Sequence, residues 1–458
     1  MKIKNYFFWI PMLLFCSNIN AQWEYVGESC QSSGNGNASS PKLALNGNEP
    51  YIVYKDAVNN GSATVKKYNG SSWEYVGNPG FSAGSIYLPS IAFYGGEPFV
   101  VYQDQANGSK ATAMKFDGTT WVNVGNPGFS PGAADYPSII FINDQPYVCF
   151  RDNANSNKAS VMKFDGTSWV NVGNPGFSPG TIPTIILSIA SYSGEPYVAF
   201  HNVSNGNKAC VMKYDGTAWV YVGPAGFSAG PAFEPSLAFN GGTPYVAYFD
   251  PSAGGNATVK KFDGTNWINV GSAGFTLGPV GPPKIAIHNN APYVAFSDYS
   301  NCGAPNGSRG SVMKFDGTAW VNVGTSCFTH TLGSQSAIIN SLEFLNSEPY
   351  VVFEDASCSN FSKTTVMKFR INTVGIQEST HRKEELIIYP NPAQNQLTLK
   401  SNLSIIGTEY KLIDHFGRIL HTGRLNETDQ TIDVEKLPEG VYFINAGNNI
   451  TKKLTIKR

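Results

Sequence analysis

The sequence predicts an all-β protein with two domains, and three observations carry this prediction. First, a segment with the pattern of a β-hairpin recurs along most of the 458 residues, as at residues 114–125. Second, the tryptophans of these segments are about 50 residues apart, a period typical of β-propeller blades. Third, the repeats stop near residue 371, and residues 386–458 show short alternating runs of their own. We therefore expect a β-propeller followed by a small C-terminal β-sandwich.

The recurring hairpin is clearest in its second complete copy. An apolar run ends in Lys115 and Phe116, Asp117 and Gly118 follow, and a Trp-Val-Asn-Val run at 121–124 returns. Asp-Gly is a pair that tolerates the positive φ angles of a two-residue type I′ turn. The pattern therefore predicts a type I′ hairpin in every copy.

Each repeat contains four strands, of which the tryptophan strand is the fourth. The three earlier ones are seen at residues 89–93, 98–102 and 111–116. The second strand is apolar at nearly every position, which suits a strand that is covered on both faces. The tryptophans are separated by 50, 48, 48, 50, 48 and 53 residues and are Trp23, Trp73, Trp121, Trp169, Trp219, Trp267 and Trp320.

The order of the strands predicts how the ring closes. Sets of the first three strands begin near Pro41, Pro89, Pro137, Thr184, Pro235, Pro283 and Ile339. The first tryptophan strand, at 23–27, precedes every set, while the last set ends at 367–369 without Asp-Gly or tryptophan. The N-terminal strand must therefore complete the last blade, which ties the ends of the ring together and removes free sheet edges. We predict a seven-bladed β-propeller at residues 22–371 with this one-plus-three closure.

Four cysteines test this register. Cys30 and Cys327 each lie seven residues after a repeated tryptophan, whereas Cys302 and Cys358 lie just after second strands. Both kinds of loop fall on one face of an up-down-up-down blade. We therefore predict the disulfides Cys302–Cys327 and Cys30–Cys358, which an oxidising compartment permits. The alternative is four free or differently paired thiols.

The two other cysteines of the repeats, Cys149 and Cys210, fall within strands at positions where other copies carry small residues. We interpret both as buried packing residues and not as metal ligands.

The N-terminus has the pattern of an export signal. Residues 1–21 combine a short cationic start, an apolar run at 6–15 and a polar stretch. The apolar run is too short to span a membrane, so we predict a secretory signal peptide. Phe15 stands where a lipoprotein signal needs a small residue before Cys16. We expect no membrane span in the mature chain, which should be soluble after export.

The overall charge excludes one class of function. The formal net charge is -1 and charged residues make up 14% of the chain, without a basic cluster. A nucleic-acid binder would show a stripe of Lys and Arg that neutralises phosphates. We therefore expect no nucleic-acid partner.

After the repeats, residues 372–385 are polar and without pattern, which predicts a linker. Alternating runs then follow at 396–400, 409–413 and 440–444, separated by turn residues. This pattern predicts the small β-sandwich at 386–458.

Four motifs of this second domain carry a resemblance to a known family. They are Tyr389-Pro390-Asn391-Pro392, Asp414-His415-Phe416-Gly417-Arg418, Leu437-Pro438-Glu439-Gly440-Val441-Tyr442 and Lys452-Lys453-Leu454. In order and spacing the domain resembles the type A C-terminal sorting domain of the type IX secretion system. The resemblance covers the last sixth of the chain.

The resemblance implies a route of export. The secretion machinery and its sortase would recognise the domain, and cleavage would fall within residues 372–385. Release, or attachment to the surface lipopolysaccharide of a Bacteroidota-type cell, would follow. The motif residues would then form packing and recognition surface and no catalytic site.

The propeller half is similar to repeat-rich surface propellers of the same bacteria and, more distantly, to kelch and Asp-box propellers. Its Asp-Gly-Thr-x-Trp motif is one residue shorter from Asp to Trp than an Asp-box. For this reason the sialidase function of some Asp-box propellers is not carried over.

A G-x-S-x-G pattern recurs between the fourth strand and the next blade. It stands at residues 80–84, 128–132, 176–180 and 226–230, with a variant at 274–278. As a nucleophile motif it needs a strand, a sharp turn and a helix. In an all-β repeat we interpret it as a turn whose Phe packs beneath the loop.

An acidic residue recurs at the end of the second strand: Asp56, Asp104, Asp152, Asp250, Asp298 and Asp355, with Asn202 in the fourth blade. Six carboxylates around one mouth could hold a cation, but Asp also caps turns by accepting backbone N–H bonds. None of the loops completes a calcium-binding spacing. We prefer turn capping and expect no metal and no cofactor.

Function is expected where the copies differ, just before first strands and near the ends of second strands. Exposed aromatic residues with a few polar groups suit a sugar or peptide site. The alternative, ordinary drift between repeats, remains the favoured interpretation of these differences. The candidates are Tyr87, Asp135, Tyr136, Arg151, His201, Phe233, Glu234 and Tyr299.

The sequence favours binding over catalysis. The histidines are scattered, and nothing places Asp135 and Glu234 at the working distance of a glycosidase pair. We predict a secreted or surface-displayed monomer that is not an enzyme and that binds a glycan or a protein or serves as a scaffold. The alternative is a carbohydrate-active propeller, of glycosidase or lyase type, with its site at the channel mouth.

Overall fold

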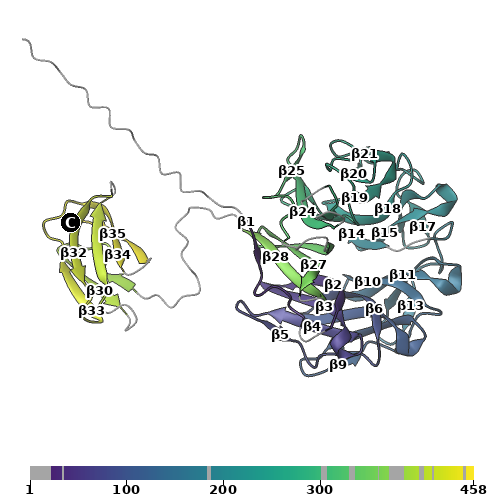
Figure 1. Ribbon diagram of the computed structural model, residues 1–458, viewed down its shortest axis with the longest axis horizontal. Coiled ribbons are helices and arrows are strands. Elements are labelled where there is room, and N and C mark those ends of the chain that lie inside the picture. Colours follow the sequence, from purple (N-terminus) through teal and green to yellow (C-terminus); the bar gives the residue numbers. More distant parts are fainter. Residues whose placement is uncertain are drawn as a thin grey trace, which may run out of the picture. The chain divides into compact units, whose positions relative to one another are not determined.

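The computed structural model describes residues 22–32, 36–182, 187–300, 307–329, 336–358, 361–370, 386–401, 407–414, 417–446 and 450–458. The chain forms two compact units, Met1–Asn372 and Thr373–Arg458 (Figure 1). The predicted signal peptide and the predicted linker lie outside the described residues, so both stay predictions.

The first unit consists of seven antiparallel four-stranded sheets. Blades one to four are β2 (Ala38–Asn46), β3 (Glu49–Asp56), β4 (Ser62–Tyr68), β5 (Trp73–Tyr75); β6 (Ile86–Tyr94), β7 (Glu97–Asp104), β8 (Lys110–Phe116), β9 (Trp121–Asn123); β10 (Ala134–Ile142), β11 (Gln145–Asp152), β12 (Lys158–Phe164), β13 (Trp169–Asn171); and β14 (Ser188–Tyr192), β15 (Glu195–Asn202), β16 (Lys208–Tyr214), β17 (Trp219–Tyr221). Blades five to seven are β18 (Phe233–Asn240), β19 (Thr243–Asp250), β20 (Asn256–Phe262), β21 (Trp267–Asn269); β22 (Lys284–His288), β23 (Ala291–Asp298), β24 (Arg309–Phe315), β25 (Trp320–Asn322); and β26 (Ala337–Leu345), β27 (Glu348–Cys358), β28 (Phe361–Arg370), β1 (Gln22–Tyr25).

The ring closes as predicted. β1 pairs antiparallel with β28, with Trp23 opposite Phe369, and completes the seventh blade (Figure 1). Each first strand contacts the first strand of the next blade, and β26 contacts β2. The seven first strands therefore form a closed inner wall, and the fold is the predicted seven-bladed propeller with one-plus-three closure.

The cores lie between neighbouring blades. From Pro98 to its end β7 is buried throughout, as expected for a second strand that is covered on both faces. Phe99 and Val101 of β7 pack with Val148 and Phe150 of β11 in one such core. Because each blade shares a core with the next, no blade is an independent unit.

The repeated tryptophans join the blades in a closed circle. Trp169 Nε1 donates to the carbonyl of Val124 in the preceding blade at 2.8 Å, and its ring stacks on Phe129 at 4.2 Å. Phe129 belongs to the recurrent G-x-S-x-G segment, so the Phe packs as predicted. The indole bonds run from Trp23 to Val323, Trp73 to Val26, Trp121 to Val76, Trp169 to Val124, Trp219 to Val172, Trp267 to Val222 and Trp320 to Val270.

This circle leads to a prediction about Trp169. In Trp169→Phe a ring is retained but the indole N–H is lost, which leaves the buried Val124 carbonyl without its donor. We expect the free energy of unfolding to fall by about 1–3 kcal/mol. Urea unfolding measures this change, and an unaltered midpoint would contradict the role of the indole bond.

The hairpin before each tryptophan is present, but its predicted turn type is wrong. Phe116 pairs with Trp121 across a four-residue turn, and only Gly118 in it has a positive φ, of 98°. Asp117 Oδ1 accepts the backbone N–H groups of Thr119 and Thr120, each at 2.8 Å. These bonds lower the pKa of Asp117. The Asp side chain therefore closes a longer turn, which a two-residue reading of Asp-Gly misses.

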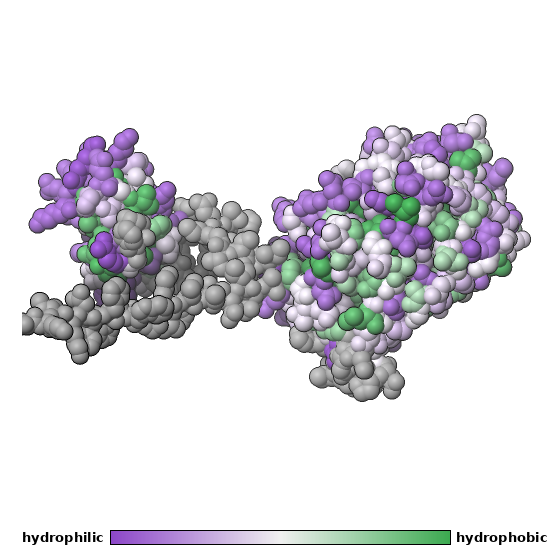
Figure 2. Space-filling view, turned by 90° about the horizontal axis from the view of Figure 1, so that it is seen from above, coloured by the Kyte–Doolittle hydropathy of each residue, from purple (hydrophilic) through white to green (hydrophobic). Residues whose placement is uncertain are grey.

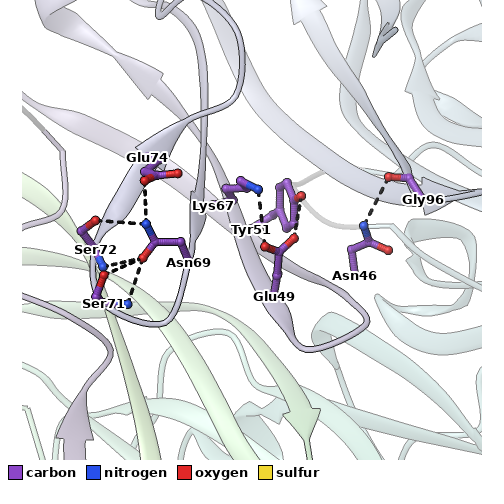
Figure 3. Close-up of polar contacts among 9 residues, drawn as sticks. All are labelled: Asn46, Glu49, Tyr51, Lys67, Asn69, Ser71, Ser72, Glu74 and Gly96. Atoms are coloured by element: carbon purple, nitrogen blue, oxygen red, sulfur yellow. Dashed lines mark hydrogen bonds and ion pairs between the residues drawn. The ribbon is translucent and has the colours of Figure 1, made fainter. Parts of the chain in front are cut away.

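Figure 3 shows the corresponding turn of the first blade, where Asn69 replaces the Asp. Its Oδ1 accepts the backbone N–H groups of Ser71 and Ser72, both at 2.9 Å. Nearer the ring wall, Asn46 Nδ2 donates to the carbonyl of Gly96 in the second blade at 3.2 Å. Polar contacts thus also join neighbouring blades at the turns of their first strands.

The Cys30–Cys358 disulfide is present, with 5.9 Å between the Cα atoms, and joins the loop after β1 to the end of β27. Cys327 is also disulfide-bonded, but its predicted partner Cys302 lies outside the described residues. Cys149 and Cys210 are free and buried, as predicted. Burial raises the pKa of the Cys149 thiol to about 12.

The second unit is the predicted β-sandwich. A three-stranded sheet consists of β29 (Leu386–Tyr389), β30 (Gln396–Ser401) and β33 (Asp429–Asp433). A four-stranded sheet consists of β32 (Ile419–Arg424), β31 (Glu409–Asp414), β34 (Gly440–Ala446) and β35 (Ile450–Ile456). Leu397 and Leu399 of one sheet share a core with Leu412 and Ile444 of the other.

Candidate ligand site in the central channel

The candidate residues before the first strands lie within those strands instead. Tyr87 is in β6, Asp135 and Tyr136 are in β10, and Phe233 and Glu234 are in β18. The strands begin earlier than predicted because a β-bulge precedes each Pro, where the register shifts, as between Asp135 and Ser138. Tyr136 and Glu234 occupy the bulges with φ of 54° and 53°. Ser40 and Leu88 have φ of 53° and 49° at the equivalent position, so the positive φ belongs to the repeat and does not by itself mark a functional site.

Most of the other candidates connect one blade to the next. Lys55 Nζ lies 3.6 Å from the centre of the Tyr87 ring. Asp135 accepts Gln103 Nε2 at 2.7 Å and forms an ion pair with Arg151, which also donates to a carbonyl before the fourth blade. The residue that precedes the capping Asp at the end of a second strand therefore often contacts the next blade. These different contacts account for the variation of this position between repeats.

His201 and Phe233 form a further junction of this kind. Their rings meet edge to face at 5.3 Å, and the His201 side chain is fully buried. Burial lowers the pKa of His201 to about 4, so the residue is neutral at physiological pH. It belongs to the core between blades and does not face a ligand.

Tyr87 and Tyr299 are the candidates that are exposed, with 46% and 49% of their surface accessible. Neither lies among the residues that line the central cavity described below. None of the eight candidates is among the residues that line that cavity.

The recurrent Asp residues cap turns, as predicted. Asp104 Oδ1 accepts the backbone N–H of Ala106 at 3.0 Å, and Oδ2 accepts Asn107 Nδ2 and Thr112 Oγ1. The short 3-10 helices that begin after these residues are η1 (Ala57–Asn59), η2 (Gln105–Asn107), η3 (Asn153–Asn155), η4 (Val203–Asn205) and η5 (Pro251–Ala253). Both oxygens of the carboxylate are thus used within the blade.

The serine of the G-x-S-x-G segments is also structural. Ser130 Oγ accepts the backbone N–H of Ala111 at 2.9 Å and donates to the carbonyl of Gly132 at 2.7 Å. The hydroxyl joins the loop to the third strand and is not a nucleophile.

The inner wall of the ring encloses a cavity of about 180 Å³. First strands of six blades line it through Lys42, Ser138, Leu187, Ser188, Pro235, Ser236, Lys284, Ile285, Asn340, Ser341, Leu342 and Glu343. Hydroxyl, ammonium and carboxyl groups therefore face the space, and it is a polar cavity.

One strand position supplies most of these polar groups. In the blades that have the bulge and its Pro, this position directly follows the Pro. It carries Ser in five blades and Lys in two. The residues are Lys42, Ser90, Ser138, Ser188, Ser236, Lys284 and Ser341, each paired with the equivalent position of the second strand. Ser236 Oγ accepts the backbone N–H of Ile285 in the next blade at 3.1 Å, and Ser188 and Ser341 make similar bonds.

Two carboxyl groups accompany the two lysines. Glu343 stands two residues beyond Ser341 on the same face of β26, where the other blades carry Ala or Ile. Glu234 occupies the bulge of β18, and its Oε2 is buried and has no hydrogen-bond partner among the described residues. We refer to Lys42, Lys284, Glu234 and Glu343 as the channel cluster.

Burial dominates the electrostatics of the channel cluster. Burial lowers the pKa of Lys42 most, the charge of Lys284 lowers it as well, and Glu234 and Glu343 oppose the shift. The resulting pKa is about 7. Burial also lowers the pKa of Lys284 and raises that of Glu234. The Glu343 side chain is open to channel water, but the surrounding wall raises its pKa to about 7. Clusters of such shifted groups are typical of functional sites.

Sequence reasoning identified Glu234 but missed Lys42, Lys284 and Glu343. The signal that marks them is a substitution within the first strand, Lys for Ser and Glu for Ala, at positions that are otherwise nearly invariant among the repeats. The sequence prediction considered only loops and strand ends, where these substitutions do not occur.

The pKa of Glu343 leads to a prediction on stability. Because its pKa is raised from 4.5 to about 7, the folded state binds more protons than the unfolded state between these values. The contribution of Glu343 to the free energy of unfolding is fully present below pH 4.5 and is lost as the pH rises through 7. Since the carboxyl meets channel water, we expect about 1 kcal/mol.

Glu343→Ala should therefore lose less stability than the wild type between pH 4.5 and 7. Urea unfolding at several pH values measures this difference, with the exposed Glu427→Ala as control. Parallel pH profiles of wild type and Glu343→Ala would contradict the shift.

Residues 387–457 match the family described as "Secretion system C-terminal sorting domain". The second unit is thus a sorting domain of the type IX secretion system, in agreement with its four motifs, and it marks the chain for the cell surface or for secretion. Its motif residues hold the sandwich together. Asn391 bonds the backbone of Lys453 and Thr455, Tyr442 Oη donates to the Pro438 carbonyl, and Arg418 pairs with Asp414.

The other motif residues lie at turns and strand ends. Tyr389 Oη donates to Asp429 at 3.0 Å, and Pro390 and Pro392 follow cis peptide bonds. Gly417 has a φ of 80°, and Gly440 begins β34.

No curated protein matches the chain. Among solved structures it is similar to PorZ, a surface component of the type IX secretion system of Porphyromonas gingivalis, at 14% identity and a TM-score of 0.44. That alignment covers 91% of this chain and 59% of PorZ. A protein of unknown function from Dyadobacter fermentans is 14% identical, with a TM-score of 0.42 and coverage of 76% and 99%.

A Trypanosoma rangeli sialidase is 10% identical, with a TM-score of 0.43 and coverage of 77% of this chain and 60% of the sialidase. Likenesses of this size say nothing about function. Among the described residues no helix has the length and apolarity to cross a membrane. The propeller face in Figure 2 is mostly hydrophilic or neutral, with scattered hydrophobic spots.

Proposed function

We propose that the protein is a non-catalytic binding module at the cell surface or in the medium, and that its ligand enters the central channel. The observation that carries the proposal is the channel cluster, in which Lys42, Lys284 and Glu343 line one polar cavity while Glu234 interacts electrostatically with both lysines. Burying ionisable groups is costly. Because five blades form the same wall with Ser at the lysine position, the charges are not needed to build the ring.

The ring supports binding because it holds these groups in place. The wall is made of strands, and the serine hydroxyls, the indole bonds and the junctions at the bulges join each blade to its neighbours. A site that is formed before the ligand arrives loses little conformational entropy on binding.

The sorting domain supports a proposed route by which this module is exported. After signal-peptide export to the periplasm, the type IX machinery and its sortase would handle the C-terminal unit and cleave within residues 372–385. The propeller would then be released or attached to the surface, as a monomer.

Catalysis on a carbohydrate is a second candidate, and one observation favours it. A carboxyl group with a pKa near 7, as at Glu343, suits a general acid at neutral pH. A glycosidase also needs a second carboxylate across the scissile bond. Asp135 is a candidate for it beside Glu234 that the sequence does not place at working distance, and Arg151 and Gln103 engage Asp135. Binding needs only the cavity and its charges, so we prefer it.

A glycan-array screen of the mature protein tests the proposal. The Lys42→Ser/Lys284→Ser variant restores the residue of the other five blades, and Lys163→Met is the control because Lys163 bonds Gln145 outside the cavity. We expect selective binding that the double variant loses and the control keeps. Binding that survives in the double variant would refute the channel site, and cleavage of a bound glycan would favour the enzyme.

A further inference from the structure

The cavity wall offers mainly hydrogen-bond donors. Ser188, Ser236 and Ser341 each accept a backbone N–H from the next blade, so each hydroxyl has its own hydrogen left to donate. Lys42 Nζ donates to the Asn340 carbonyl at 3.0 Å and has two further hydrogens. Such a wall suits a ligand rich in oxygen acceptors.

The two lysines indicate that the ligand carries a negative charge. Lys42 and Lys284 stand at equivalent positions of the first and sixth blades, on either side of the seventh, whose Ser341 lies at the same level. Lys284 also disfavours the charge of Lys42, whose pKa it lowers. An anion between them would relieve this repulsion and favour both ammonium forms.

Glu343 supplies an acceptor. It lines the cavity and its side chain is open to channel water, whereas Glu234 is not among the lining residues and its Oε2 is buried. A ligand hydroxyl can therefore donate to Glu343.

We propose that the cavity binds a sugar acid, with its carboxylate between Lys42 and Lys284 and a hydroxyl that donates to Glu343. The cavity of about 180 Å³ is partly open to solvent and has room for a single small ring. The inference rests on the proposed function, because it assigns a ligand class to the same site.

Titration calorimetry of the mature protein with free D-glucuronate tests the assignment, with D-glucose as neutral probe and inorganic phosphate as an anion without hydroxymethine groups. We expect glucuronate to bind at least tenfold more tightly than either. Lys42→Ser and Lys284→Ser should each weaken glucuronate at least tenfold, and Lys163→Met should leave it unchanged. Glu343→Gln should weaken glucuronate more than phosphate, because only the sugar donates a hydroxyl.

Several outcomes would overturn the assignment. Equal binding of glucose would mean that the lysines do not select an anion, and equal binding of phosphate would mean that the sugar hydroxyls contribute nothing. If glucuronate does not bind while the glycan array shows lysine-dependent binding, the ligand class is wrong and the channel site stands. If the array binding is also independent of the lysines, both proposals fall. The Ser variants keep the residue of the other blades, and circular dichroism checks their fold.

Discussion

Removal of residues 22–27 is expected to destabilise the whole ring and not the seventh blade alone. β1 is the outer strand of that blade, and Trp23 both donates to the Val323 carbonyl at 2.9 Å and stacks on Phe328 at 3.9 Å. Truncation of a fully buried Trp costs about 3–5 kcal/mol, and the partly buried Trp23 should contribute toward the lower end of this range. Since a domain is stable by about 5–15 kcal/mol, the deletion should remove much of the total.

The measurement compares mature chains that begin at residue 22 and at residue 28. Urea unfolding followed by circular dichroism and by tryptophan fluorescence should show a large common shift of the midpoint. Because neighbouring blades share cores, both signals should move together. An unchanged cooperative transition would contradict the closure.

Loss of the Cys30–Cys358 disulfide should have the next largest effect. The bond joins positions 328 residues apart and so restricts the unfolded chain strongly. On the chain-entropy argument, Cys30→Ala/Cys358→Ala should cost roughly 4–6 kcal/mol. Urea unfolding of the variant and of the wild type measures the loss.

Cys149→Ala is the matched control, because the fourth, fifth and sixth blades carry Ala at the equivalent position. It removes a free buried thiol and should cost much less. A double variant as stable as this control would show that the disulfide does not hold the ring.

The ring could be predicted because its repeats fix one register many times. Seven tryptophans at a nearly constant spacing located the fourth strands, and the position of Trp23 before any complete set determined the closure. Cys30 and Cys358 followed from the same register, since equivalent loops of a closed ring meet.

Local geometry was less predictable. Asp-Gly is compatible with a two-residue turn and with a four-residue turn, and only the bonds from Asp117 to Thr119 and Thr120 decide between them. The bulges at Tyr136 and Glu234 were also missed, because they depend on contacts between blades and not on local preference.

The residues of the channel cluster were harder to predict than the local geometry. Exposed loops suggested the variable residues Asp135 and Arg151, but these pair with each other at a blade junction. Lys42, Lys284 and Glu343 come from three different blades, and only the closed ring brings their strand faces to one cavity. A position-by-position comparison of the first strands would have revealed the substitutions, although not their proximity.

The most direct test of the channel site is the acylation of individual lysines by acetic anhydride at pH 7.5, read by peptide mass spectrometry. Only a neutral amine reacts, and an ordinary lysine with a pKa of about 10.4 is almost entirely charged at this pH. With a pKa of about 7, Lys42 should react much faster than Lys163, and D-glucuronate should suppress its reaction by covering and charging it. Equal reaction of Lys42 and Lys163, unaffected by glucuronate, would contradict both the lowered pKa of Lys42 and a sugar-acid site beside it.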